Sequence, residues 1–159
     1  MRRLRFGRRP TRADAARFIG HLRTPQRTSA LRSVVDGVIV ARTLRQRGAR
    51  PLLARIGDGD GGELDTARSI EVAAAVDAGL GLIPIAPTCL RRSITLLREL
   101  KRLGLNGKMH VGVQHLSQGV EAHAWVQVGA VVVNDDRTVT DRYVELAAGE
   151  VEAMAAQLR

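Results

Sequence analysis

The stretch PTCLRRSITLLRELKRLGLNGKMHVGV, residues 87–113, predicts a helix followed directly by a strand. In its first half, apolar side chains recur at steps of three and four residues, as on one face of a helix, and Gly104 marks the helix end. From residue 108 the period changes to two, which is typical of a strand. The only cysteine of the chain, Cys89, stands in the first turn of this helix. Unpaired backbone N–H groups there favour a thiolate over a thiol, so the pattern indicates a reactive sulfur.

Three strands are predicted after this helix. Residues 108–114, 122–128 and 131–135 read as strands, and a tight turn at Gly129 and Ala130 joins the last two. Helices therefore come first in the chain and an antiparallel meander follows. This order predicts an α+β fold in which the cysteine-bearing helix packs against a small antiparallel sheet.

A histidine and two aspartates on these strands are candidates to complete a catalytic triad with the cysteine. Regular pairing through the turn places Asp136 directly opposite His123, whereas a bulge or a longer turn would favour Asp135. The pairing therefore leaves two carboxylates open. In a Cys-His-Asp site the imidazole takes the thiol proton, the carboxylate orients the ring, and the thiolate attacks a carbonyl carbon. Backbone N–H groups of Cys89 or Leu90 would be the natural oxyanion donors.

The N-terminal part of the chain is predicted to be helical and strongly basic. Helices are expected over 11–23 and 29–48, and residues 1–55 hold 15 arginines against two aspartates, which gives +13. We interpret 1–60 as a basic helical region and 61–159 as the catalytic core, within one compact domain. Such a concentration of charge favours contact with an anionic partner.

The remaining predicted elements flank this core. They are a solvated linker over 57–65, a helix that Asp65 caps and Gly79 ends, a possible fourth strand over 140–147 and a closing helix over 149–159. On the helix expected over 29–48, the apolar face comprises Leu31, Val34, Val35, Val38, Ile39, Ala41 and Leu44. On the helix after Asp65, the apolar side comprises Ile70, Ala73, Ala74 and Val76.

Length, hydropathy and charge favour some classes of protein over others. A chain of 159 residues, 45% of them hydrophobic, is the size of one domain with its own core. Because no apolar stretch approaches the roughly 20 residues that cross a bilayer, we expect a soluble, cytoplasmic protein. The net charge of +9 keeps a nucleic-acid-binding domain as an alternative, but aromatic residues make up 3% of the chain, which leaves little on which bases could stack. No paired Cys or His spacing supports a metal site, and we expect no cofactor.

Three blocks together resemble the leader peptidase family of lasso-peptide biosynthesis. They are Cys-Leu-x-Arg-Ser on the helix, His-Ala-Trp-Val on a strand and Asn-Asp after a short loop, within residues 65–136. The resemblance to these transglutaminase-like cysteine proteases implies a papain- or transglutaminase-like core. It also implies a Cys-His-Asp triad, which falls on Cys89, His123 and Asp135, the aspartate that follows Asn134.

The resemblance further implies a reaction and its partners. Members of that family cut the leader from a ribosomally made precursor peptide, and a separate ATP-dependent cyclase then closes the macrolactam. The expected partners are therefore the precursor, a discrete leader-recognition protein and the cyclase, and neither nucleic acid nor membrane. The first 60 residues do not resemble a strand-rich recognition module, so we expect the stand-alone protease. An acyltransferase or transglutaminase would use the same three residues with an amine in place of water, and no residue distinguishes the two.

Overall fold

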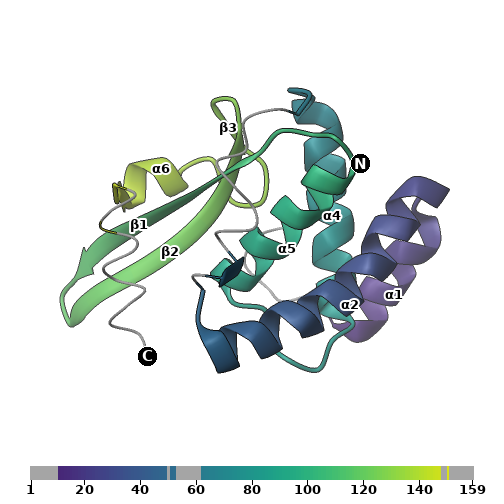
Figure 1. Ribbon diagram of the computed structural model, residues 1–159, viewed down its shortest axis with the longest axis horizontal. Helices are drawn as coiled ribbons and strands as arrows, with labels where there is room; N and C mark the ends of the chain where they lie inside the picture. Colours follow the sequence, from purple (N-terminus) through teal and green to yellow (C-terminus); the bar gives the residue numbers. More distant parts are fainter. Residues whose placement is uncertain (1–10, 50, 53–61, 148–149, 151–159) are drawn as a thin grey trace.

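The computed structural model describes residues 11–49, 51–52, 62–147 and 150, which form an α+β fold. A long β1–β2 hairpin lies on one side of the molecule and the long helices lie on the other (Figure 1). The sheet is antiparallel in the order β3-β2-β1-β4. The elements are α1 (Arg12–His21), α2 (Thr24–Arg47), α4 (Thr66–Gly81), α5 (Cys89–Arg102), β1 (Lys108–Leu116), β2 (Gly119–Val128), β3 (Val131–Val132), α6 (Val139–Arg142) and β4 (Val144–Glu145).

The predicted turn at Gly129 is confirmed. Val128 pairs with Val131 across it, and Gly129 has a φ of 59°, a conformation that glycine adopts without steric cost. The third strand is shorter than predicted and ends at residue 132, although the Val133 N–H still donates to the Val126 carbonyl. The prediction of a fourth strand over 140–147 is wrong in its first half, because that segment forms the short helix α6 before the two-residue strand β4.

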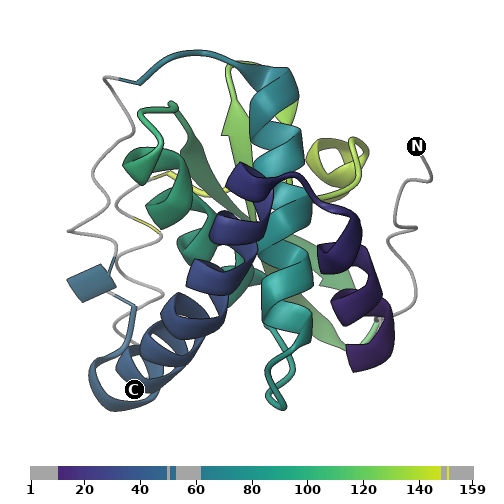
Figure 2. The ribbon, with the colours of Figure 1, turned by 90° about the vertical axis from the view of Figure 1, so that its right-hand side faces the viewer.

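Helix α5 lies between the sheet and the other long helices. It packs against β2 on one side and against α4 and α2 on the other, while α1 packs on α4 (Figures 1 and 2). The main core forms where α4, α5 and β2 meet. Its fully or nearly buried members include Val72, Val76, Leu80, Leu96, Leu97, Leu100, Val126 and Val128.

The second face of the sheet carries its own apolar cluster. Trp125 lies there with Val132, and Val139 and Tyr143 from α6 and its end cover them. Val126, the next residue along β2, belongs instead to the main core. The predicted alternation along β2 is therefore confirmed.

The predicted apolar face of α2 is right for Val34 and Leu44, which pack against the core, and wrong for four other residues. Leu31, Val35, Val38 and Ile39 are exposed, between 45% and 60% of their surface. The helix instead buries its small residues, namely Ser29, Ala30, Ser33, Gly37 and Val40, together with Asp36. Helix α4 buries Ala73 and Val76, as predicted, but it exposes Ile70 and buries Val72 instead.

Close helix packing explains this reversal. A Cβ built on Gly79 of α4 would lie 2.1 Å from the Ala30 carbonyl oxygen of α2, so the two backbones are in direct contact there. A Cβ on Gly37 would lie 2.3 Å from the side chain of Leu80. Small residues are required where helices approach this closely, and apolar periodicity gives no signal for them.

An ion cluster joins α2 to α5 beside this contact. The buried Asp36 carboxylate accepts hydrogen bonds from Arg98, at 3.0 Å, and from Arg102. Arg102 also lies 3.1 Å from Glu99, which is fully buried. The only acid of α2 therefore bonds α5 rather than facing solvent.

Some predictions fall outside the described residues. These are the basic segment 1–10, most of the linker over 57–65, the closing helix except Glu150, and the division at residue 60, which stays a prediction. The predicted cap of α4 is confirmed, because Asp65 accepts from the Arg68 N–H at 2.9 Å. Of the helices in the described part of the chain, none is both long and apolar enough to traverse a bilayer.

Candidate active site

The N-terminus of α5 places the sulfur. Pro84 and Pro87 keep the preceding segment out of helical conformation, and Thr88 caps the helix by accepting from the Arg91 N–H at 3.3 Å. Cys89 is therefore the first helical residue, and it is partly buried. The Arg91 side chain donates back to the Ile85 carbonyl at 2.5 Å, which fixes the approach to the helix.

His123 on β2 and Asp135, after β3, form the second part of the site. The His123 Nε2 lies 2.6 Å from the Asp135 Oδ2, and both side chains are mostly buried. Because Nε2 contacts the carboxylate, Nδ1 is the ring nitrogen left for the sulfur. The structure thus brings Cys89 and His123 together with Asp135, the carboxylate that the family resemblance implied and that strand pairing left open against Asp136.

The second aspartate plays a local role instead. The Asp136 carboxylate accepts from the backbone N–H of Thr138 at 2.8 Å and from its hydroxyl at 2.7 Å, and the residue is exposed. Its own N–H donates to the Asp135 carboxylate at 2.7 Å. The carboxylate that contacts the imidazole is therefore Asp135.

The proton balance between sulfur and ring favours the ion pair. Burial alone would raise the pKa of the Cys89 thiol, but hydrogen bonding to His123 and to the backbone N–H groups of Ala124 and Leu90 holds it below its usual value. The Asp135 carboxylate, and then the Cys89 sulfur, raise the pKa of His123 to about 9. A thiolate next to an imidazolium is the reactive form of a cysteine nucleophile.

The Arg92 guanidinium helps to keep the Asp135 carboxylate ionised. Burial would raise the pKa of Asp135, but the bond to His123 and the nearby Arg92 guanidinium hold it low. Arg92 itself forms a bidentate ion pair with Asp77 of α4, at 2.9 and 2.6 Å. The carboxylate that faces the ring therefore stays ionised at neutral pH.

Aromatic rings pack against the imidazole. The centroid of Tyr143 lies 4.9 Å from that of His123, nearly parallel to it, and Trp125 lies 6.4 Å away. Trp125 is 1% exposed, so it belongs to the core. The imidazole is therefore stacked against Tyr143 while its Nε2 contacts Asp135.

Sequence reasoning missed four neighbours of the triad: Asp77, Arg92, Ser93 and Asn134. Three of them stand inside the quoted Cys-Leu-x-Arg-Ser and Asn-Asp blocks, so the signal was present without an assigned role. Asp77 lies 12 residues before Cys89 on another helix, and no local pattern connects it to the site.

Comparison with known protein families gives a match over most of the chain. The family described as "Transglutaminase-like superfamily" matches residues 30–148, which is most of the chain. No curated protein and no solved structure matches.

Proposed function

Because the chain belongs to the transglutaminase-like superfamily, we propose that it is a cysteine peptidase that cuts the leader from a ribosomally made lasso-peptide precursor. The observation that carries the proposal is the 2.6 Å contact between His123 and Asp135 beside a sulfur at a helix N-terminus. The superfamily supports a protease or acyltransferase scaffold. The choice of a lasso-peptide leader rests on the resemblance of the Cys89, His123 and Asp135 blocks to that peptidase family.

The first half of the reaction acylates the enzyme. The Cys89 thiolate adds to the leader-side carbonyl carbon of the scissile bond, and the carbonyl oxygen takes the negative charge. As the C–N bond breaks, the His123 imidazolium gives its Nδ1 proton to the leaving nitrogen. The core peptide leaves with a free amine, and the leader remains as a thioester on the sulfur.

The second half releases the leader. The neutral imidazole takes a proton from water, whose oxygen adds to the thioester carbonyl, and the thiolate departs. The leader leaves with a new carboxyl group, and the thiolate–imidazolium pair is restored. Asp135 holds the ring in the required orientation throughout and stabilises its charged form.

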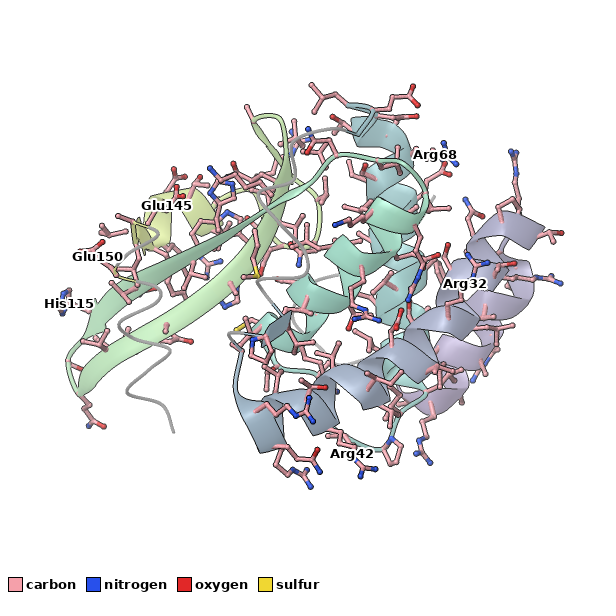
Figure 3. All side chains as sticks on the ribbon, in the orientation of Figure 1. Arg32, Arg42, Arg68, His115, Glu145 and Glu150 are labelled. Atoms are coloured by element: carbon pink, nitrogen blue, oxygen red, sulfur yellow. The ribbon has the colours of Figure 1, made fainter. Side chains whose placement is uncertain are left out.

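Cleavage of a precursor tests the proposal. Wild type, Cys89→Ala and His123→Ala are incubated with a candidate precursor and its leader-recognition protein, and the products are weighed by mass spectrometry. We expect only the wild type, and neither variant, to give two fragments whose masses sum to that of the precursor plus one water. His115→Ala is the matched control, because that ring is exposed near the tip of the β1–β2 hairpin (Figure 3). Cleavage that survives Cys89→Ala would refute the proposal.

Amine transfer is the second candidate, since the superfamily includes that chemistry on the same scaffold. It would replace water by an amine in the second half-reaction and leave the first unchanged. Adding a primary amine to the same incubation separates the two. Transfer gives a leader product whose mass contains the amine, whereas a peptidase gives the free carboxylate.

The proposal includes a discrete recognition protein that holds the leader. Residues 11–49 form two helices and are not themselves a strand-rich recognition module. We call the exposed side chains of Leu31, Val35, Val38 and Ile39 the α2 outer face. Exposed arginines flank the α2 outer face, among them Arg32 and Arg42 of the same helix (Figure 3).

This face fits a partner surface that is apolar and acidic. Helix α2 presents no acid of its own, because Asp36 is buried in the ion cluster. Charge complementarity of this kind raises the encounter rate and fixes orientation more than it adds affinity. The apolar side chains would supply the affinity. We propose that the recognition protein docks on the α2 outer face, and the cyclase is a further expected partner of the released core peptide.

A further inference from the structure

The side chain of Asn134 joins three elements of the site. It is 4% exposed, and its Oδ1 accepts from the Val126 N–H of β2 at 2.7 Å. Its Nδ2 donates to the Ser93 hydroxyl of α5 at 3.1 Å. Ser93, which is fully buried, in turn donates to the Ala124 carbonyl of β2 at 3.1 Å. The three hydrogen bonds connect helix α5, strand β2 and the segment after β3 in one buried network.

Each anchor of this network is next to one member of the triad. Ser93 lies one helical turn after Cys89, and Ala124 directly follows His123 in the sequence. Asn134 itself directly precedes Asp135. A displacement of any of these three residues therefore moves the sulfur, the imidazole or the carboxylate.

The network also explains how the chain leaves the sheet. Val133 still bonds β2 through its N–H, which donates to the Val126 carbonyl at 3.0 Å. The Val126 N–H, however, donates to the Asn134 side chain, where a regular ladder would offer the Val133 carbonyl. A side chain thus closes the ladder, and the backbone is free to turn and place Asp135 against His123.

A second contact holds the same residue from the helical side. Arg92 donates to the Asn134 carbonyl at 3.1 Å while it pairs with Asp77 of α4. Both the backbone and the side chain of Asn134 are therefore fixed by residues outside its own segment. A buried side chain that is hydrogen-bonded through both its oxygen and its nitrogen favours a single geometry.

We infer that Asn134 is a positioning residue, which acts with Ser93 to hold the Cys89 sulfur, the His123 ring and the Asp135 carboxylate in register. The inference rests on the proposed function only in taking these three groups as the reacting ones. Asn134 touches none of the reacting atoms and acts through its neighbours. Loss of its side chain loosens the Cys89–His123 contact.

Alkylation of the single cysteine measures this effect without a substrate. The rate of carboxamidomethylation by iodoacetamide is followed by mass spectrometry from pH 5 to pH 9, on variants whose circular dichroism is native. Thiolate reacts and thiol does not, so the rate at low pH reports how well the imidazole stabilises the thiolate. The variants are Asn134→Ala, Ser93→Ala, their double and His123→Ala.

Thr95→Val is the matched control. Thr95 is also a fully buried hydroxyl residue of α5, but its hydroxyl bonds the Arg91 carbonyl of its own helix, at 2.8 Å. We expect the wild type to react readily at pH 6. The rise of the rate with pH should lie about one unit higher in Asn134→Ala and in Ser93→Ala, as for a thiol whose pKa rises by one unit, so each reacts up to about tenfold more slowly where thiolate is the minor form. The rates at pH 9 converge, and Thr95→Val keeps the wild-type profile.

The double variant adds a second criterion. If both residues act through one network, it reacts about as slowly at pH 6 as either single variant. Unchanged profiles for both single variants, or an equal shift in Thr95→Val, would overturn the positioning role. Ser93→Ala removes only one oxygen atom. If Asn134→Ala does not fold, the alkylation profile of Ser93→Ala alone tests the positioning role. A wild-type profile identical to that of His123→Ala would instead refute the ion pair, and with it the proposed function.

Discussion

The Nε2 atom of His123 lies 2.6 Å from a carboxylate oxygen of Asp135, while the neighbouring Asp136 turns its carboxylate to Thr138. We therefore expect Asp135→Asn to lower kcat/KM for precursor cleavage by about two to four orders of magnitude, because the amide no longer stabilises the charged ring. Asp136→Asn is the matched control and keeps activity within a few-fold. Equal losses in both variants would contradict the assignment.

The pH profile of cleavage follows from the two shifted groups. The pKa of Cys89 lies below its usual value, so the thiolate is present, and kcat/KM is substantial, at pH values where an ordinary thiol is protonated. The pKa of His123 is about 9, and above it the ring loses the proton that the leaving amine needs. We expect a bell-shaped profile that declines beyond about pH 9. A rate that keeps rising through pH 9 would argue against the ion pair.

The ion cluster between α2 and α5 makes stability depend on pH. Burial would raise the pKa of Asp36, but Arg102 and Arg98 lower it overall. A carboxyl whose pKa is lower in the folded state stabilises the fold above its unfolded pKa of about 3.9 and loses this contribution as pH falls further. We expect Asp36→Asn to cost about 2 kcal/mol of unfolding free energy at pH 6, the size of the contribution from hydrogen bonds to a charged group. Urea titrations should show this difference shrinking below pH 4, and a constant difference would count against it.

The contact between α2 and α4 should not tolerate a methyl group. A Cβ at Gly79 meets the Ala30 carbonyl, a backbone atom that cannot move aside alone. We expect Gly79→Ala to lower the unfolding free energy by about 1–3 kcal/mol, measured by urea denaturation. Gly20→Ala in α1 is the control, because a Cβ there has no neighbour within 4 Å, and it should be neutral or slightly stabilising.

The α2 outer face should affect cleavage only when the recognition protein is present. We expect Leu31→Glu and Val35→Glu to lower the rate of partner-dependent cleavage at least tenfold, because each places an acid where an acidic partner would dock. Alkylation of Cys89 should be unchanged. Val144→Glu is the control, since Val144 is 72% exposed on β4, away from α2. Wild-type cleavage by the α2 variants would exclude this face as the docking surface.

The local parts of the site could be read from the sequence. Helical spacing after Cys89 and period two around His123 predicted the right elements, since both signals depend on residues a few positions apart. The carboxylate remained open between Asp135 and Asp136, because a side chain, that of Asn134, closes the β2 ladder and redirects the chain. The rules of backbone pairing do not predict where a side-chain oxygen takes the place of a backbone carbonyl.

The packing of α2 could not be read in the same way. Apolar spacing selected Leu31 and Val35, whereas the buried face is built from Ala30, Ser33 and Gly37. The sequence shows which residues of α2 are small, but only the position of α4 shows at which of these positions a small residue is required. The same limit hid Asp77, whose link to the site exists only because α4 and α5 pack together.

The direct backbone contact of Gly79 with Ala30 sets how far the protein can be trimmed. A shortened chain that starts at the proposed core, residue 61, would leave the main chain of α4 open to water and Arg98 and Arg102 without their shared acid. Deletions from the amino end, or fusions that displace it, should therefore stop before Thr24, where α2 begins.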